Sequence, residues 1–204
     1  MRFQSRKSLA PLAVMVGAVL LSASPRVRAD GSLVGNLWDA LRGRVPHETA
    51  FGMYAGTAYD WSHMSFLLFS GQALFDYDAI WPHPAPEGLR LRLEANAGAA
   101  TGTDFSGERL VASAGFLGVY EFGSPKTSRF VPYVEGGVEG IYTDFQREDQ
   151  GSRLNFNPVA GIGVRSGSGF VVLRIHHVSN AGLNDKNRGI NSIVLGFGVY
   201  LGTR

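Results

Sequence analysis

Apolar and polar residues alternate along most of the chain, and this period of two constrains the fold more than any other feature. In residues 89–97 (LRLRLEANA), leucine and alanine fill one set of alternate positions, and charged or amide side chains fill the other. Residues 130–139 and 193–202 repeat the alternation, the latter with glycine at three of the opposite positions. Successive side chains of a β-strand point to opposite faces, so each segment predicts a strand with one apolar face.

Eight such segments follow one another, with boundaries that we expect to be accurate to about two to four residues. The predicted strands are 49–60, 63–77, 88–100, 109–122, 129–143, 153–166, 170–180 and 191–202. Residues typical of turns predict the breaks at 60–62, 81–86, 101–108, 123–125, 146–152, 167–169 and 181–190. The second, fourth and sixth strands alternate less cleanly, so their facing stays open.

Alternating strands build both soluble β-sandwiches and membrane β-barrels, and the face opposite the apolar one distinguishes the two classes. In a sandwich that face meets water, whereas in a small barrel it fills a narrow interior that suits glycine and paired charges. After residue 29, glycine makes up 26 of 175 residues. The charged positions on the polar faces are Arg90, Arg92, Glu94, Glu135 and Glu139. We therefore predict an all-β fold, an eight-stranded antiparallel transmembrane β-barrel of the outer membrane.

Residues 1–29 predict a signal peptide for export. Positive charges at positions 2, 6 and 7 precede an uncharged apolar run, and small or apolar residues at 27 and 29 suit a cleavage site. After Asp30 the longest stretches without a charged residue are 15 residues, too short for a spanning helix of about 20. Residues 30–48 then predict either an N-terminal arm or a short amphipathic helix with leucines at spacing four, and residues 49–204 the barrel.

Aromatic residues gather near the predicted strand ends, where some of them are expected to form girdles at the membrane interfaces. They are Tyr54, Tyr59, Trp61, Trp81, Tyr120, Phe122, Phe130, Tyr133 and Tyr142.

Charge and cysteine content exclude several classes of function. Residues 1–29 hold five of the 19 Lys and Arg and no acid, which leaves 14 positive against 17 negative side chains. A nucleic-acid binder needs a basic face, so we expect no nucleic-acid partner. The absence of cysteine excludes disulfides, thiolate metal sites and a cysteine nucleophile. We also expect no metal and no cofactor, since the adjacent His176 and His177 point to opposite faces of a strand.

Polar side chains interrupt an apolar strand face within residues 173–180 (LRIHHVSN). By alternation, His177 and Ser179 continue the apolar face, whereas His176 points into the interior. Asn191 shares the apolar face of the next strand and is expected beside them. A histidine that reaches a serine hydroxyl is the base and nucleophile of an acyl hydrolase. The alternative is that these residues only mark the membrane–water interface.

Residues 177–183 (HVSNAGL) and 187–192 (NRGINS) resemble the C-terminal signature of the lipid A 3-O-deacylase family (PagL type). The resemblance implies an outer-membrane barrel that hydrolyses the ester-linked 3-hydroxyacyl chain of lipid A in lipopolysaccharide. It implies that Ser179 is the nucleophile, that His177 is the general base, and that Asn180, helped by the backbone of Gly182, stabilises the oxyanion. The family has a glutamate where this chain has Asn191.

Asparagine can accept the ring N–H of His177, but it carries no charge to stabilise a protonated ring. We therefore expect a weak or conditionally active carboxylic ester hydrolase, with Asp185 of the connecting loop as another source of an acid. The alternative from a different class is a catalytically silent outer-membrane barrel with a structural or interaction role.

Overall fold

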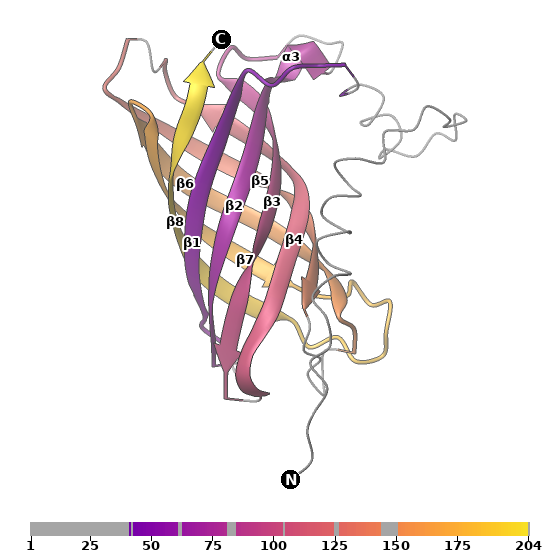
Figure 1. Cartoon of the computed structure of the whole chain (residues 1–204). Coiled ribbons are helices and arrows are strands. Elements are labelled where there is room, and N and C mark those ends of the chain that lie inside the picture. The colour runs from indigo at the N-terminus through magenta and orange to yellow at the C-terminus, as the bar shows by residue number, and fades with distance from the viewer. Residues whose placement is uncertain are drawn as a thin grey trace, which may run out of the picture. The chain divides into compact units, whose positions relative to one another are not determined.

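Eight antiparallel strands form a closed barrel in the computed structural model (Figure 1). The model describes residues 41, 43–60, 63–80, 85–103, 105–124, 127–143 and 151–203. The strands are β1 (Glu48–Ala58), β2 (Met64–Asp76), β3 (Leu89–Gly102), β4 (Phe105–Glu121), β5 (Phe130–Thr143), β6 (Leu154–Ser166), β7 (Gly169–Val178) and β8 (Ile190–Thr203). Each strand pairs with the next along the chain and β8 pairs with β1, so the predicted fold class is confirmed.

The connections between strands lie at two opposite ends of the barrel (Figure 1). The end that we call the C-terminal end carries the last residues of β8 and the four-residue helix α3 (Tyr77–Ile80), which the sequence did not predict. The opposite end, called the loop end, carries the connections β1–β2, β3–β4, β5–β6 and β7–β8. The predicted cluster of polar residues at 177–191 therefore belongs to the loop end.

The hairpin of β3 and β4 differs from its prediction. β4 begins at Phe105, four residues before its predicted start, and β3 ends at Gly102, within the predicted break over 101–108. All other strand boundaries agree with the prediction within two residues. Ser106, Gly107 and Glu108 are exposed, and Gly107 adopts a φ of 74°. The register of the hairpin shifts between Ala100, which pairs with Arg109, and Gly102, which pairs with Phe105, so residues 106–108 form an irregularity within β4 rather than a loop.

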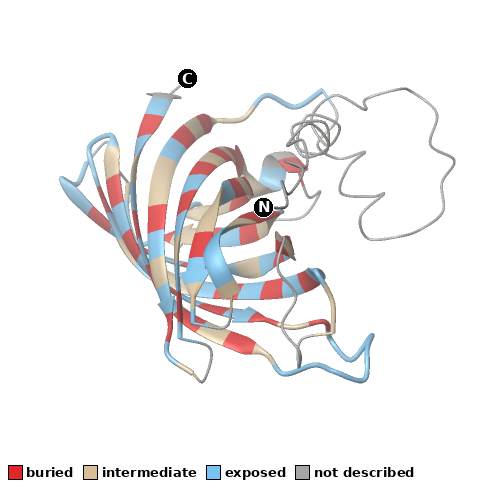
Figure 2. Cartoon of the chain, turned by 60° about the horizontal axis from the view of Figure 1, so that its bottom comes forward, coloured by how far each residue is buried: buried red, intermediate tan, exposed pale blue. Residues whose placement is uncertain are grey.

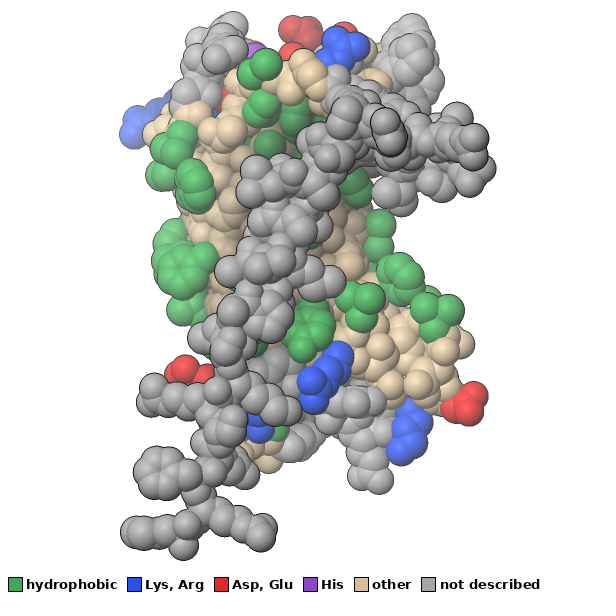
Figure 3. Space-filling model, turned by 45° about the vertical axis from the view of Figure 1, so that its right-hand side comes forward, with side chains coloured by type: hydrophobic (Ala, Val, Ile, Leu, Met, Phe, Trp, Pro, Cys, Tyr) green, Lys and Arg blue, Asp and Glu red, His purple; other side chains and the backbone are tan. Residues whose placement is uncertain are grey.

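Apolar side chains cover the outer surface of the barrel. Buried and exposed positions alternate along the strands in Figure 2, and hydrophobic side chains occupy the flank in Figure 3, with charged ones towards the two ends. On β7 and β8 the exposed large apolar residues are Val171, Leu173, Ile175, Ile193, Leu195, Phe197, Val199 and Leu201. An apolar band around a closed sheet is the surface that a transmembrane barrel presents to hydrocarbon.

Ion pairs fill the interior of the barrel at two levels. Arg174 donates to both carboxylate oxygens of Glu94 at 2.6 and 2.8 Å and also pairs with Glu135, while Arg92 pairs with the same two acids. Nearer the C-terminal end, Arg165 donates to both oxygens of Glu48 at 2.6 Å. The interior placement predicted for the charged faces is thus confirmed for these strands.

The girdle prediction is wrong for Tyr54 and Tyr133, whose side chains are buried inside the barrel. Both residues lie on the inward face of their strands, opposite glycines on neighbouring strands. A Cβ atom on Gly196 would lie 2.1 Å from Cε1 of Tyr54, and one on Gly163 would lie 2.3 Å from Cζ of Tyr133. The glycines therefore provide the space for these rings. The aromatic residues exposed as predicted include Tyr59, Phe122 and Phe130.

Some predictions fall on parts of the chain that the structure does not describe. Trp61, Trp81, the signal peptide over 1–29 and residues 30–40 of the arm or helix predicted over 30–48 lie outside the described residues. Among the described residues, no helix has the length and apolar character needed to cross a membrane.

Candidate active site

Three neighbouring strands bring the predicted polar residues together at the loop end of the barrel. The register pairs His177 of β7 directly with Asn191 of β8. On the other side of Asn191, the backbone N–H of Tyr59, directly after β1, donates to its carbonyl oxygen at 3.1 Å. His177 is exposed on the outer surface, whereas His176 is buried in the interior, as the alternation predicted.

A hydrogen bond of 2.7 Å joins Nδ1 of His177 to Oδ1 of Asn191. Because an amide oxygen can only accept, Nδ1 carries the ring proton in this pair. The second nitrogen, Nε2, then holds the lone pair of the neutral ring. Asn191 therefore sets the tautomer in which the imidazole can accept a proton at Nε2.

Gly189 lies against the same imidazole ring. A Cβ atom on Gly189 would lie 2.6 Å from Cε1 of His177 and 3.2 Å from Nε2. Such a contact is too short for a side chain of any kind, so the observed position of the ring requires glycine here. The backbone of Gly189 does not adopt a positive φ, which makes this a requirement for space rather than for conformation.

Ser179 extends the β7 ladder by one residue pair. Its N–H and its carbonyl oxygen both bond to Phe156 of β6, at 2.9 and 2.8 Å. This bridge keeps the backbone extended, so the half-buried Ser179 lies two residues beyond His177 on the same side of the sheet. Within the described residues, no hydrogen bond joins the Ser179 hydroxyl to the His177 ring.

Asn180 is buried, and its polar groups organise the loop between β7 and β8. Its Nδ2 donates to the carbonyl of Lys186 at 2.8 Å, and its Oδ1 accepts the N–H of Gly182 at 3.0 Å. Ala181 and Gly182 adopt φ values of 54° and 80°, which turn the chain sharply after the ladder. Both predicted oxyanion donors thus bond within the loop, and their role stays a prediction.

An acidic residue that the sequence analysis did not select also contacts the site. Oδ2 of Asp60, in the connection between β1 and β2, accepts the backbone N–H of Asn191 at 2.6 Å. Residues 60 and 191 are far apart in the sequence, and the signal that could have found this contact is the pairing of first and last strands in a closed barrel. Asp185, the acid considered from the sequence, is exposed in the loop.

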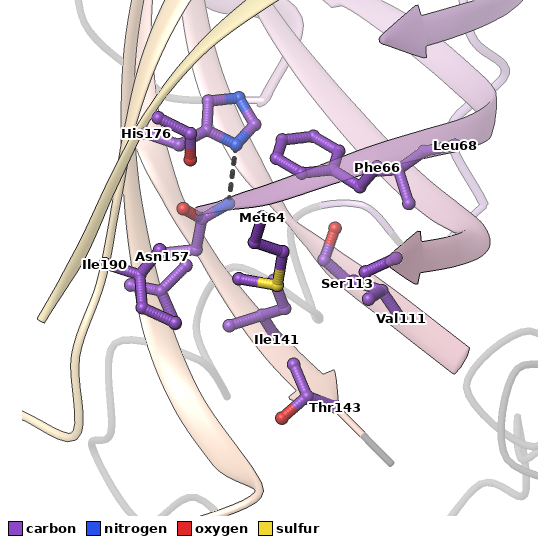
Figure 4. A pocket seen from close by; sticks show the side chains of 13 residues that line it. Met64, Phe66, Leu68, Val111, Ser113, Ile141, Thr143, Asn157, His176 and Ile190 are labelled. Atoms are coloured by element: carbon purple, nitrogen blue, oxygen red, sulfur yellow. Dashed lines mark hydrogen bonds between the residues drawn. The ribbon is translucent and has the colours of Figure 1, made fainter. Parts of the chain in front are cut away.

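A cavity of about 40 Å³ lies in the interior, on the other side of the sheet from these residues (Figure 4). Its wall includes the inward-facing neighbours of the site, His176, Val178 and Ser192. Nδ1 of His176 lies 3.3 Å from Nδ2 of Asn157 in this wall. A cavity of this size has room for a few water molecules.

A family model described as lipid A 3-O-deacylase (PagL) matches residues 75–200. The chain belongs to the lipid A 3-O-deacylase (PagL) family. All five residues that the sequence analysis assigned to the site lie within the matched range. Family membership confirms the resemblance seen in the sequence, and it makes this barrel a relative of hydrolases that act on lipid A.

Two solved structures resemble the barrel. The structure of the outer membrane enzyme PagL shares 25% sequence identity with a TM-score of 0.55, covering 74% of this chain and 98% of that one. Neisserial surface protein A shares 14% identity with a TM-score of 0.50, covering 76% of this chain and 94% of that one, and shows the fold alone. No curated protein sequence is significantly similar to the chain. The PagL match confirms the predicted location in the outer membrane.

Proposed function

We propose that this PagL-family barrel hydrolyses the ester-linked 3-hydroxyacyl chain of lipid A in lipopolysaccharide, with Ser179 and His177 on its lipid-facing surface. The observation that carries the proposal is the 2.7 Å hydrogen bond between His177 and Asn191 on the outer surface. That bond orients an imidazole as a general base two residues from a serine, in a family of lipid A deacylases.

In the proposed mechanism, Ser179 Oγ attacks the ester carbonyl carbon while Nε2 of His177 takes the hydroxyl proton. The carbonyl oxygen becomes an oxyanion, which Asn180 and the N–H of Gly182 stabilise once the loop has released them from their present partners. The intermediate then breaks its bond to the leaving alkoxide, and His177 returns the proton to that oxygen. Water cleaves the acyl-enzyme by the same route, releasing the 3-hydroxy fatty acid and restoring Ser179.

The proposal requires the Ser179 hydroxyl to turn towards Nε2 of His177 when substrate binds. Catalytic hydrogen bonds often tighten only in the complex with substrate, so the present orientation of the hydroxyl is compatible with this step. The reaction needs no metal or cofactor. In the part of the chain that the structure describes, no group of three His, Asp or Glu side chains is arranged to hold a metal ion.

The outward direction of the site suits the proposed substrate. The acyl chains of lipid A lie in the outer leaflet beside the barrel, where His177 is exposed. A site that presents its reactive groups to the lipid meets these chains without having to take them into the interior.

Mass spectrometry of lipid A from cells that produce the protein tests the proposal. We expect loss of one 3-hydroxyacyl group with the wild type and no loss with Ser179→Ala, which removes the nucleophile. Ser168→Ala, in the exposed turn at the C-terminal end, is the matched control and should behave as the wild type. Identical spectra for wild type and Ser179→Ala would support the silent structural barrel instead.

A further inference from the structure

We infer that Asp60 is the acidic partner of the site and that it acts on His177 through Asn191. The inference rests on the proposed function and deepens it, because it names a positioning residue for the same reaction. The family resemblance leaves this chain with an uncharged Asn191 where an acid is expected. Asp60, in the connection between β1 and β2, supplies a negative charge against the backbone of Asn191.

Hydrogen bonds connect three residues in a row, from β7, from β8 and from the connection between β1 and β2. Nδ1 of His177 lies 2.7 Å from Oδ1 of Asn191, and the backbone N–H of Asn191 lies 2.6 Å from Oδ2 of Asp60. The row exists because the barrel closes by pairing β8 with β1.

The charge matters at the step in which His177 takes the proton of the nucleophile. The ring then becomes positive, and an opposite charge nearby favours that charged form. Asn191 accepts the N–H of the ring but offers no charge. Asp60 holds its carboxylate against the backbone N–H of Asn191, the residue whose side chain bonds to the ring, so its charge acts on the imidazolium through space.

Several other residues lie around His177, and they differ from Asp60 in their position relative to Asn191, the partner of the ring. The register of β6 and β7 places Pro158, which has no charge, beside His177, and His176 points into the barrel. The loop between β7 and β8 carries the exposed charges of Asp185, Lys186 and Arg188, and His63 is exposed in the connection that holds Asp60. Asp60 is the acid that is bonded directly to the partner of the ring.

Asp60→Asn tests the inference because it removes the charge and keeps an oxygen that can accept the N–H of Asn191. We expect kcat for lipid A deacylation to fall roughly tenfold with KM unchanged. A fall of this size is the effect that the loss of one nearby charge has on the rate. Asp60→Glu, which keeps the charge, should retain most of the activity. A loss with Asp185→Asn but not with Asp60→Asn would overturn the inference.

The Asn191→Glu background separates a charge effect from a structural one. With a carboxylate introduced beside the ring, the charge of Asp60 becomes redundant and repels its new neighbour. Asp60→Asn should therefore cause no loss in this background, or a small gain. If Asp60 only held the backbone of residue 191 in place, Asp60→Asn would cause the same loss in both backgrounds, and that result would overturn the inference.

Labelling of Ser179 by a fluorophosphonate probe distinguishes failure of the inference from failure of the proposed function. The probe reacts with a serine that its histidine activates, so it measures the reactivity of Ser179 without lipid A. We expect Asp60→Asn to slow labelling roughly tenfold, as it slows deacylation. Labelling without deacylation would overturn the proposed substrate, and the labelling rates would still test Asp60. Equal rates for wild type and Asp60→Asn overturn the inference alone. Absence of both labelling and deacylation overturns both.

Discussion

Asn191 is the residue at which this chain departs from its family, and its side chain nevertheless holds the His177 ring at 2.7 Å. The activity of variants at this position should depend on whether the new side chain gives the His177 ring a hydrogen-bond acceptor, a negative charge or neither. Asn191→Ala removes the acceptor and should lower kcat, whereas Asn191→Glu adds a charge and should raise kcat roughly tenfold. Deacylation rates of the purified variants in detergent check this order. A rate for Asn191→Glu no higher than that of the wild type would show that the missing charge does not limit the reaction.

Gly189 fixes the position of the same ring from the side. In Gly189→Ala the new methyl group would lie 2.6 Å from Cε1 of His177, so the ring has to move away. Because small displacements of a catalytic group are costly, we expect kcat to fall roughly ten- to hundredfold while the barrel still folds. Gly140→Ala is the matched control, since its Cβ would lie 4.0 Å from the nearest atom. Equal rates for the two variants would contradict the role of this contact.

The sequence was sufficient for some residues of the site and not for others. Alternation correctly predicted that His177 faces outwards and His176 inwards, because a regular strand has a fixed period. The orientation of Asn180 depends on a loop without periodicity, where its side chain bonds to the carbonyl of Lys186. The contact of Asp60 with Asn191 depends on closure of the barrel rather than on any local pattern.

Alternation and turn residues predict the number of strands and their boundaries, and both agree closely with the structure. The segments that differ from the prediction are those whose conformation does not depend on the alternation of apolar and polar residues. Helix α3 is a single turn, too short to show a helical repeat, and the β3–β4 hairpin continues through polar residues. Tyr54 and Tyr133 point inwards because a side chain's direction depends on its face of the strand and not on its distance from the strand end.

The ion-pair network around Arg174 joins strands that are distant in sequence. This guanidinium bonds to Glu94 on β3 and to Glu135 on β5. Arg174→Gln would leave two buried carboxylates with too little positive charge, and we expect it to lower the free energy of unfolding by about 3–5 kcal/mol. Urea unfolding in vesicles measures this change. Arg153→Gln, at an exposed position, should leave stability nearly unchanged, and equal effects of the two variants would contradict the interpretation.

The whole molecule is a barrel whose outer surface faces hydrocarbon, and stability should depend on the depth of a substituted residue. Leu195 is 51% exposed in the middle of β8, whereas Leu183 is 81% exposed in the loop between β7 and β8. Leu195→Arg should cost about 2–4 kcal/mol of folding free energy in vesicles, and Leu183→Arg at most about 1 kcal/mol. The same unfolding assay compares them. A cost at position 183 equal to that at position 195 would mean that the membrane does not surround β8 as inferred.

The ion pairs that occupy the lumen also determine how products can leave. Between Arg165 near one end and the small cavity near the other, the described side chains fill the interior with paired charges and aromatic rings. In the proposed reaction, a fatty acid released beside His177 therefore enters the surrounding leaflet rather than an interior that holds ion pairs. It must diffuse away laterally, together with the shortened lipid, before the next molecule can dock.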